Sequence, residues 1–315
     1  MQIGKRFGPW GGALIVLLTL AGGAIRLAGQ DRPAGFGRAF AAIDRLWPEV
    51  NLNVLVLDKS GAPQKIDEQA FQLFEDRAER PLRFPASVDS PVSVALLIDS
   101  SGSIYKRKPE IVSAVTAIIK ALPAGSEVTA VDFAEQAYID LPLTPVSKVD
   151  FSFLDWLRPN GRTSLLDAVI ATEDYLGGNA KYVRRALVIL SDGEENASGN
   201  SASAALGGIL LPGAPTIYAC RVRDPRRTLN DLTESARGHK MLEFLAKMGG
   251  GPTFNLDPDP AAAAAQIAAD IRNQHVLQFT AADPAHDGKL HKLEVRLPVK
   301  DLQVHVLPAY LAPSE

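Results

Sequence analysis

Short apolar runs alternate with amphipathic stretches through the middle of the chain. Val92–Leu97 is apolar except for Ser93, as expected of a strand buried on both faces. Pro109–Leu122 follows it and places its apolar residues on one helical stripe: Ile111, Val115, Ile118, Ile119 and Leu122. Ala186–Leu190 is a second apolar strand. This alternation predicts a doubly wound α/β fold, in which helices cover both faces of a three-layer, mainly parallel sheet.

The same patterns give the other elements of this α/β body, which is expected to run from residue 90 to residue 273. Strands are predicted over 128–133, 137–141 and 216–222, the first two in hairpin-like succession. Helices are predicted over 149–157, 165–176, 201–211, 239–247 and 261–273.

The pattern on either side of this body is β-like. Before it, the expected strands are 51–57, 70–75 and 80–84, and after it they are 276–280, 290–297 and 302–307, with a turn at Asp287-Gly288. Three short strands alone are marginally stable. We therefore expect the segments 49–89 and 274–315 to meet in a small β-sandwich beside the α/β body.

The first thirty residues read as a targeting segment. Lys5 and Arg6 precede an apolar run from Trp10 to Ile25, which is shorter than the roughly 20 residues of a spanning helix. A cleaved signal peptide is favoured, and an uncleaved signal anchor is the alternative because Arg26 directly follows the run. Residues 31–48 then form a linker. The rest of the chain is expected to be extracytoplasmic: periplasmic, secreted or membrane-anchored and facing outward.

Composition narrows the class of protein. The hydrophobic fraction of 46% and the charged fraction of 22% are ordinary for a globular protein. The net charge of −3 gives no reason to expect nucleic acid as a partner. The single cysteine, Cys220, cannot form an intrachain disulfide and is expected to be a small core residue.

Motifs of common enzyme classes are missing from the sequence. It contains no GxxxxGK[ST], GxGxxG, HExxH or GxSxG. The five histidines all lie in the C-terminal quarter, and each is expected to be a surface or strand residue: His239, His275, His286, His291 and His305. The sequence therefore predicts a protein that is not an enzyme.

The candidate functional residues lie just after the end of the predicted strand 92–97. Asp99, Ser101 and Ser103 follow it, at the kind of sheet edge where ligands bind in open α/β folds. One carboxylate and two hydroxyls offer only oxygen ligands, which suits Mg²⁺. The alternative is that the two serine hydroxyls cap the following helix.

Asp99-Ser100-Ser101-Gly102-Ser103 resembles the DxSxS motif that opens the metal-ion-dependent adhesion site of von Willebrand factor type A domains. The segment 161–168, GRTSLLDA, is similar to the family's second loop, and Ser191-Asp192-Gly193 is similar to its third. The resemblance implies five metal ligands: Asp99, Ser101, Ser103, Thr163 and Asp192. It further implies Mg²⁺ as the cofactor, with Mn²⁺ as a substitute, and a protein partner whose acidic side chain completes the metal shell. Ca²⁺ should bind less well, and Zn²⁺ is disfavoured because these loops hold no His or Cys.

Other acidic residues of these loops are given simpler roles. Asp167 is expected to be a solvated or capping carboxylate, because the family's direct ligand is the threonine. Glu194 and Glu195 are expected to face water, and the alternative is that they raise the acidity around the third loop.

The flanking β segments resemble those of a bacterial von Willebrand factor A-related family first described from acidobacteria. The resemblance is carried by Asp58–Pro63, Phe71–Asp76, Asp287–Arg296 and Tyr310–Pro313.

The sequence leaves two functions open for this protein. One is a metal-dependent adhesion or protein-binding module. The other is a structural component of a cell-envelope assembly, in which the metal only stabilises the loops.

Overall fold

The computed structural model describes residues 47–157, 159–223, 232–282 and 287–313. Within them, six strands form the central sheet in the order β6-β5-β4-β7-β8-β9. Every neighbouring pair is parallel except β5 and β6, which are antiparallel. The strands are β4 (Ser93–Asp99), β5 (Glu127–Phe133), β6 (Ala137–Pro145), β7 (Arg185–Ser191), β8 (Thr216–Arg221) and β9 (Thr253–Asn255).

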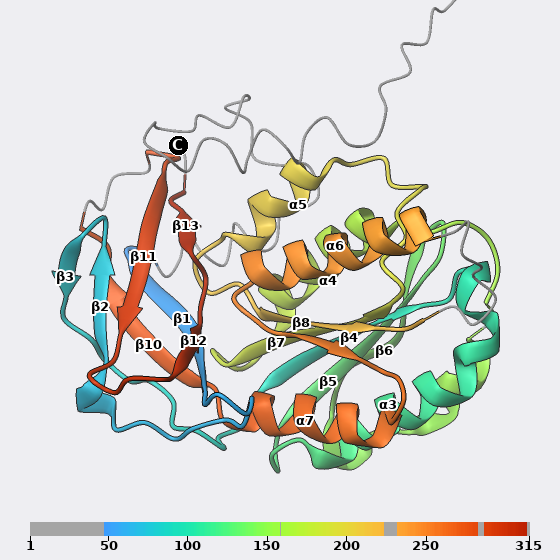
Figure 1. Ribbon diagram of the computed structural model, residues 1–315, viewed down its shortest axis with the longest axis horizontal. Helices are drawn as coiled ribbons and strands as arrows, with labels where there is room; N and C mark the ends of the chain where they lie inside the picture. The colour runs from blue at the N-terminus through green and yellow to red at the C-terminus, as the bar shows by residue number, and fades with distance from the viewer. Residues whose placement is uncertain (1–46, 158, 224–231, 283–286, 314–315) are drawn as a thin grey trace, which may run out of the picture.

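Helices cover both faces of this sheet, which confirms the predicted doubly wound α/β fold (Figure 1). One face carries α3 (Lys108–Ala121) and α7 (Pro260–Arg272). The other carries α4 (Leu165–Asn179), α5 (Ala202–Ile209) and α6 (Leu232–Met248). The helix expected over 149–157 is instead a short 3₁₀ helix, η4 (Phe151–Trp156), and another, η3 (Val146–Lys148), precedes it. The Asp150 carboxylate accepts a hydrogen bond from the Ser152 N–H at the start of η4. Cys220 is fully buried in β8, as expected.

The flanking segments form two antiparallel sheets beside the α/β body, as expected (Figure 1). The first has the order β10-β1-β12 and the second β13-β11-β2-β3. Their strands are β1 (Glu49–Leu57), β2 (Gln72–Glu75), β3 (Ala78–Arg80), β10 (His275–Thr280), β11 (Leu290–Arg296), β12 (Gln303–His305) and β13 (Ala309–Leu311), and η1 (Glu68–Ala70) precedes β2. The strand expected over 80–84 is wrong: β3 ends at Arg80, and Arg83 makes only an isolated bridge to Gln278.

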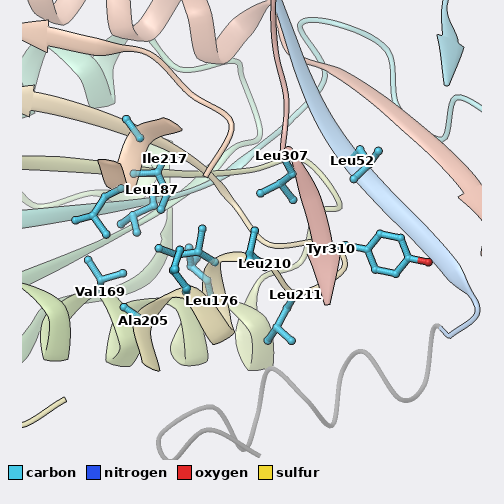
Figure 2. Packing of buried hydrophobic residues seen from close by; sticks show 14 of the residues in the cluster. Leu52, Val169, Leu176, Leu187, Ala205, Leu210, Leu211, Ile217, Leu307 and Tyr310 are labelled. Atoms are coloured by element: carbon cyan, nitrogen blue, oxygen red, sulfur yellow. The ribbon is translucent and has the colours of Figure 1, made fainter. Parts of the chain in front are cut away.

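One hydrophobic core joins these sheets to the α/β body. Figure 2 shows Leu210 and Leu211 between Leu187 and Ile217 of the central sheet and Tyr310 of β13. The backbone follows the same path, since the Leu311 N–H donates to the Leu210 carbonyl at 2.7 Å. The β segments are therefore packed into the molecule and are not a peripheral extension of the central sheet.

A polar network holds the second sheet together. The fully buried Glu75 carboxylate accepts hydrogen bonds from the Tyr310 hydroxyl at 2.5 Å and from Arg80 Nε at 2.8 Å. His291 stacks on the Tyr310 ring with centroids 5.1 Å apart, and its Nδ1 lies 2.9 Å from Asp76 Oδ2. Four of these residues lie in the flanking motifs, and Arg80 is the last residue of β3. These motifs therefore have a structural role in joining β2, β11 and β13.

A buried carboxyl on the last turn of α7 makes the stability of the fold depend on pH. Asp270 is 1% exposed, and its Oδ1 accepts a hydrogen bond from Gln266 Nε2, but Oδ2 has no hydrogen-bond partner among the described residues. Burial raises the pKa of this carboxyl to about 7. Because the native pKa lies above the unfolded one, the native chain keeps a proton that the unfolded chain releases, and stability falls as the pH rises from about 4 to 7.

Asp270→Asn is therefore expected to raise the free energy of unfolding by about 2 kcal/mol at pH 8, where the parent must bury a charge. At pH 4 the variant and the parent should be nearly equal. Urea unfolding at the two pH values measures the difference, with Glu68→Gln at an exposed site as the control. An equal effect at both pH values would contradict the proposed protonation.

No described helix is long and apolar enough to cross a membrane. The predicted targeting segment, 1–30, and most of the linker, 31–48, lie outside the described residues.

Candidate functional site

The predicted ligands come from three loops at the carboxyl ends of β4 and β7. Asp99 is the last residue of β4, Asp192 directly follows β7, and Thr163 lies two residues before α4. From β4 the chain continues to β5 and β6 on one side, and it then crosses to β7 on the other side of β4. The carboxyl ends of β4 and β7 therefore meet at the switch point of the sheet. Ligands of open α/β folds bind at such a point.

The first loop folds around the Asp99 carboxylate, which is 1% exposed. Its Oδ1 accepts a hydrogen bond from the Ser101 N–H at 2.8 Å. The Ser101 and Ser103 hydroxyl oxygens lie 3.1 Å apart. Ser101 stands at the N-cap of η2 (Gly102–Arg107), yet its side chain makes no capping hydrogen bond to any residue the structure describes. Capping therefore does not account for the Ser101 hydroxyl.

Backbone hydrogen bonds tie the three loops to one another. The Gly102 N–H donates to the Gly161 carbonyl at 3.1 Å, which joins the first loop to the second. The Thr163 N–H donates to Asn196 Oδ1 at 2.9 Å, and the Thr163 carbonyl accepts from the Asn196 N–H at 3.0 Å. This reciprocal pair joins the second loop to the third. All five predicted ligands are thus brought to one corner of the molecule.

The Thr163 hydroxyl is the most informative atom of this corner. Thr163 is 1% exposed, and within the described part of the chain its Oγ1 has no hydrogen-bond partner. A buried hydroxyl without a partner is costly. A cation held by the neighbouring oxygens would remove that cost, so the residues present fit a hard metal ion such as Mg²⁺.

The charges of the corner favour a cation too. Burial, and after it the negative charge of Asp192, raises the pKa of the Asp99 carboxyl to about 7. The Ser191 hydroxyl donates to Asp99 Oδ2 at 2.5 Å. Among the described residues, no three His, Cys, Asp or Glu side chains gather as a metal-binding group. Binding of a metal at this corner would therefore depend on the hydroxyl oxygens as well as the two carboxylates.

The expectation that Glu195 faces water is wrong. Its Oε2 accepts a hydrogen bond from the Leu166 N–H at 2.9 Å, in the first turn of α4, and its Oε1 accepts one from the Ser198 N–H. Glu195 therefore caps α4 and fixes the end of the second loop. Asp167 accepts hydrogen bonds from the Gly199 and Asn200 N–H groups at 2.7 and 3.0 Å. Both residues precede α5 (Ala202–Ile209), so the Asp167 carboxylate holds the loop that follows Glu195 and does not cap a helix.

A family comparison matches the same three loops. Residues 94–195, from β4 to the end of the third loop, match the family model of the von Willebrand factor type A domain. This part of the chain is a type A domain. The strands and helices that place the predicted ligands of the type A domain all lie within or directly beside the matched segment.

Solved structures similar to the chain share low sequence identity with it. An aerotolerance-related membrane protein from Bacteroides fragilis is 20% identical over 57% of this chain and 98% of its own, with a TM-score of 0.45. A von Willebrand factor type A protein from Catenulispora acidiphila is 12% identical over 84% of this chain and 73% of its own, with a TM-score of 0.46. The PilB minor pilin from Streptococcus sanguinis, as a D319A mutant, is 15% identical over 60% and 64%, with a TM-score of 0.45. At these values the likeness says nothing about function. No curated protein matches the sequence.

Two supporting residues of the type A domain were missed by the sequence reasoning. Ser191 bonds Asp99 and also accepts from the Gly193 N–H at 2.9 Å, and Asn196 joins two loops through Thr163. Ser191 stands next to Asp192 at the end of an apolar strand, which was the available signal. Nothing in the sequence pointed to Asn196, because its partner lies 33 residues away.

Proposed function

We propose that the chain is an extracytoplasmic, metal-dependent protein-binding or adhesion module. In this proposal Asp99, Ser101, Ser103, Thr163 and Asp192 hold Mg²⁺, and Mn²⁺ can replace it. The observation that carries the proposal is the buried Thr163 hydroxyl, which has no hydrogen-bond partner among the described residues at a corner that also holds two carboxylates.

The ligand set leaves room for a partner. Mg²⁺ takes six oxygen ligands in near-octahedral geometry, and the chain offers five side chains, three of them neutral hydroxyls. When bound, the ion would supply a cationic position that an acidic side chain of a protein partner can fill. The chain's own residues position this site: Ser191 orients the Asp99 carboxylate, and Asn196 fixes the loop of Thr163. We assign no catalytic step to the chain.

Binding to carboxylates tests this function. The full chain is expected to bind a surface coated with glutamate-rich peptide in Mg²⁺ or Mn²⁺, and to be released by EDTA. A matched glutamine-rich surface should not bind. Asp99→Asn should lower binding by at least about tenfold, since it removes a charged ligand. Asp301→Asn, at an exposed site of the β segments, should bind as the parent does.

The structural alternative makes a different prediction for the same experiment. If the metal only stabilises the loops of an envelope component, Mg²⁺ should stabilise the fold while neither surface binds. Truncation after Asn273 does not separate the two functions, because it removes β10–β13 and with them core residues such as Phe279 and Tyr310. Binding that is equal on the two surfaces, or that survives EDTA, would contradict the proposed function.

A further inference from the structure

A groove opens directly beside the first metal-binding loop. It encloses about 560 Å³ and is lined by Tyr105, Lys106, Lys108, Pro109, Leu157, Pro159 and Asn160. Tyr105 and Lys106 belong to η2, which begins within the DxSxS motif. On the other wall, the Asn160 N–H donates to the Ser100 carbonyl at 2.8 Å. The groove and the metal corner therefore share the same two loops.

The lining of this groove combines apolar surface with positive charge. Tyr105 is 63% exposed, and it faces the groove together with Pro109, Leu157 and Pro159. An exposed aromatic side chain at the edge of a polar site is the kind of residue that protein interfaces favour. None of the lining residues, all of which the structure describes, is acidic.

The two lysines of the groove differ in how they are held. Lys108 Nζ donates to the Asp155 and Leu157 carbonyls at 3.2 and 2.8 Å, so these two hydrogen bonds hold its side chain in one place. Lys106 is exposed and makes no ion pair with any described residue. The neighbouring Arg107, by contrast, is paired with Asp257 and Glu110. Lys106 is therefore the cation of η2 that remains available to a partner.

We propose that this groove binds the continuation of the partner segment whose carboxylate occupies the metal site, and that Lys106 pairs with a second acidic side chain on that segment. This inference rests on the proposed function and specifies its partner. Ser103 and Lys106 are one turn of η2 apart, a rise of about 6 Å. An extended peptide covers that distance in about two residues. The partner is thus an acidic protein segment with two carboxylates two or three residues apart and an apolar side chain between them, against Tyr105.

Model peptides test this reading with the full chain. Three labelled peptides share a Gly/Ser background around the central sequences Asp-Leu-Phe-Glu, Asp-Leu-Phe-Gln and Asn-Leu-Phe-Gln. In Mg²⁺, fluorescence anisotropy should show the two-acid peptide binding roughly fivefold more tightly than the single-acid peptide, the size expected of an exposed ion pair. The peptide without acids should not bind.

Three variants separate the groove from the metal site. Lys106→Gln should remove the difference between the two acidic peptides, and Lys148→Gln, at an exposed site beyond the far end of β6, should keep it. Tyr105→Ala should weaken both acidic peptides by about tenfold. If both acidic peptides bind equally, are released by EDTA and are unaffected by Lys106→Gln and by Tyr105→Ala, the groove inference is overturned and the proposed function stands. If no peptide binds the parent in a Mg²⁺-dependent way, both fail.

Discussion

Replacing Gly193 with alanine is expected to destabilise the chain by about 2–5 kcal/mol and to abolish metal binding. Gly193 follows Asp192 in the third loop and has φ +80°. A Cβ at this position would lie 2.1 Å from the Gly238 carbonyl oxygen and 2.9 Å from Leu242 Cγ. The left-handed backbone costs alanine about 1–2 kcal/mol, and the overlap with the backbone of α6 adds about 1–3 kcal/mol. Urea unfolding and the Mg²⁺-dependent shift of Tm measure the two effects.

Gly213→Ala is the matched control for this substitution. Gly213 has φ +77°, close to that of Gly193, but no described atom lies within 4 Å of its ideal Cβ. The control should therefore lose only the conformational term, about 1–2 kcal/mol, and should keep its response to Mg²⁺. Equal losses in the two variants would mean that the contact with α6 does not hold the third loop.

Replacing Arg184 with methionine is expected to cost about 3–5 kcal/mol. Its guanidinium is fully buried and donates to the Ser90 carbonyl, to the Ile271 carbonyl at 2.6 Å and to the Arg272 carbonyl at 2.9 Å. Burial lowers the pKa of this guanidinium to about 10, so it remains charged at neutral pH. Ser90 lies where the chain enters the α/β body. Ile271 lies at the end of α7, where the chain leaves the α/β body for β10. Methionine keeps the apolar bulk but leaves these buried carbonyls without their charged donor.

Arg272→Met is the comparison for Arg184→Met. Arg272 pairs with Asp89 at 2.9 Å in the same region, but the two side chains are 45% and 48% exposed. An exposed ion pair contributes about 1 kcal/mol or less, so this variant should unfold close to the parent in urea. A loss below about 1 kcal/mol for Arg184→Met would show that the guanidinium does not hold the two connections.

The α/β body could be predicted from the sequence because its strands are buried on both faces. Ala186–Leu190 and Val92–Leu97 are apolar runs of strand length, and the helices between them have apolar stripes. The short strands were harder to predict from the sequence. β9 has three residues and β13 has three, too few for a periodic pattern, and their pairing partners lie far along the chain.

The candidate site was predictable to the extent that its residues stand in motifs at strand ends. Asp99 ends one apolar strand, with Ser101 and Ser103 in the loop after it, and Asp192 directly follows another. Thr163 shortly precedes a helix. The supporting contacts were not predictable, because they join separate loops. Glu195 was expected to face water since its position in a polar loop gave no sign that the first turn of α4 lies beside it. The polarity of the surrounding sequence does not show that a residue has a hydrogen-bond partner from a distant part of the chain.

Thermal unfolding of the full chain in EDTA, Mg²⁺ and Mn²⁺, compared with Thr163→Val, tests the central claim most directly. The variant removes the buried hydroxyl but keeps the shape of the side chain. Mg²⁺ or Mn²⁺ at about 100 times its dissociation constant should stabilise the parent by roughly 2.7 kcal/mol, a visible rise in Tm. Thr163→Val should show little or no rise, and its Tm in EDTA should be equal to that of the parent or higher, because no buried hydroxyl is left without a partner. A parent whose Tm ignores both metals, or a variant that responds as the parent does, would contradict a metal site built on Thr163.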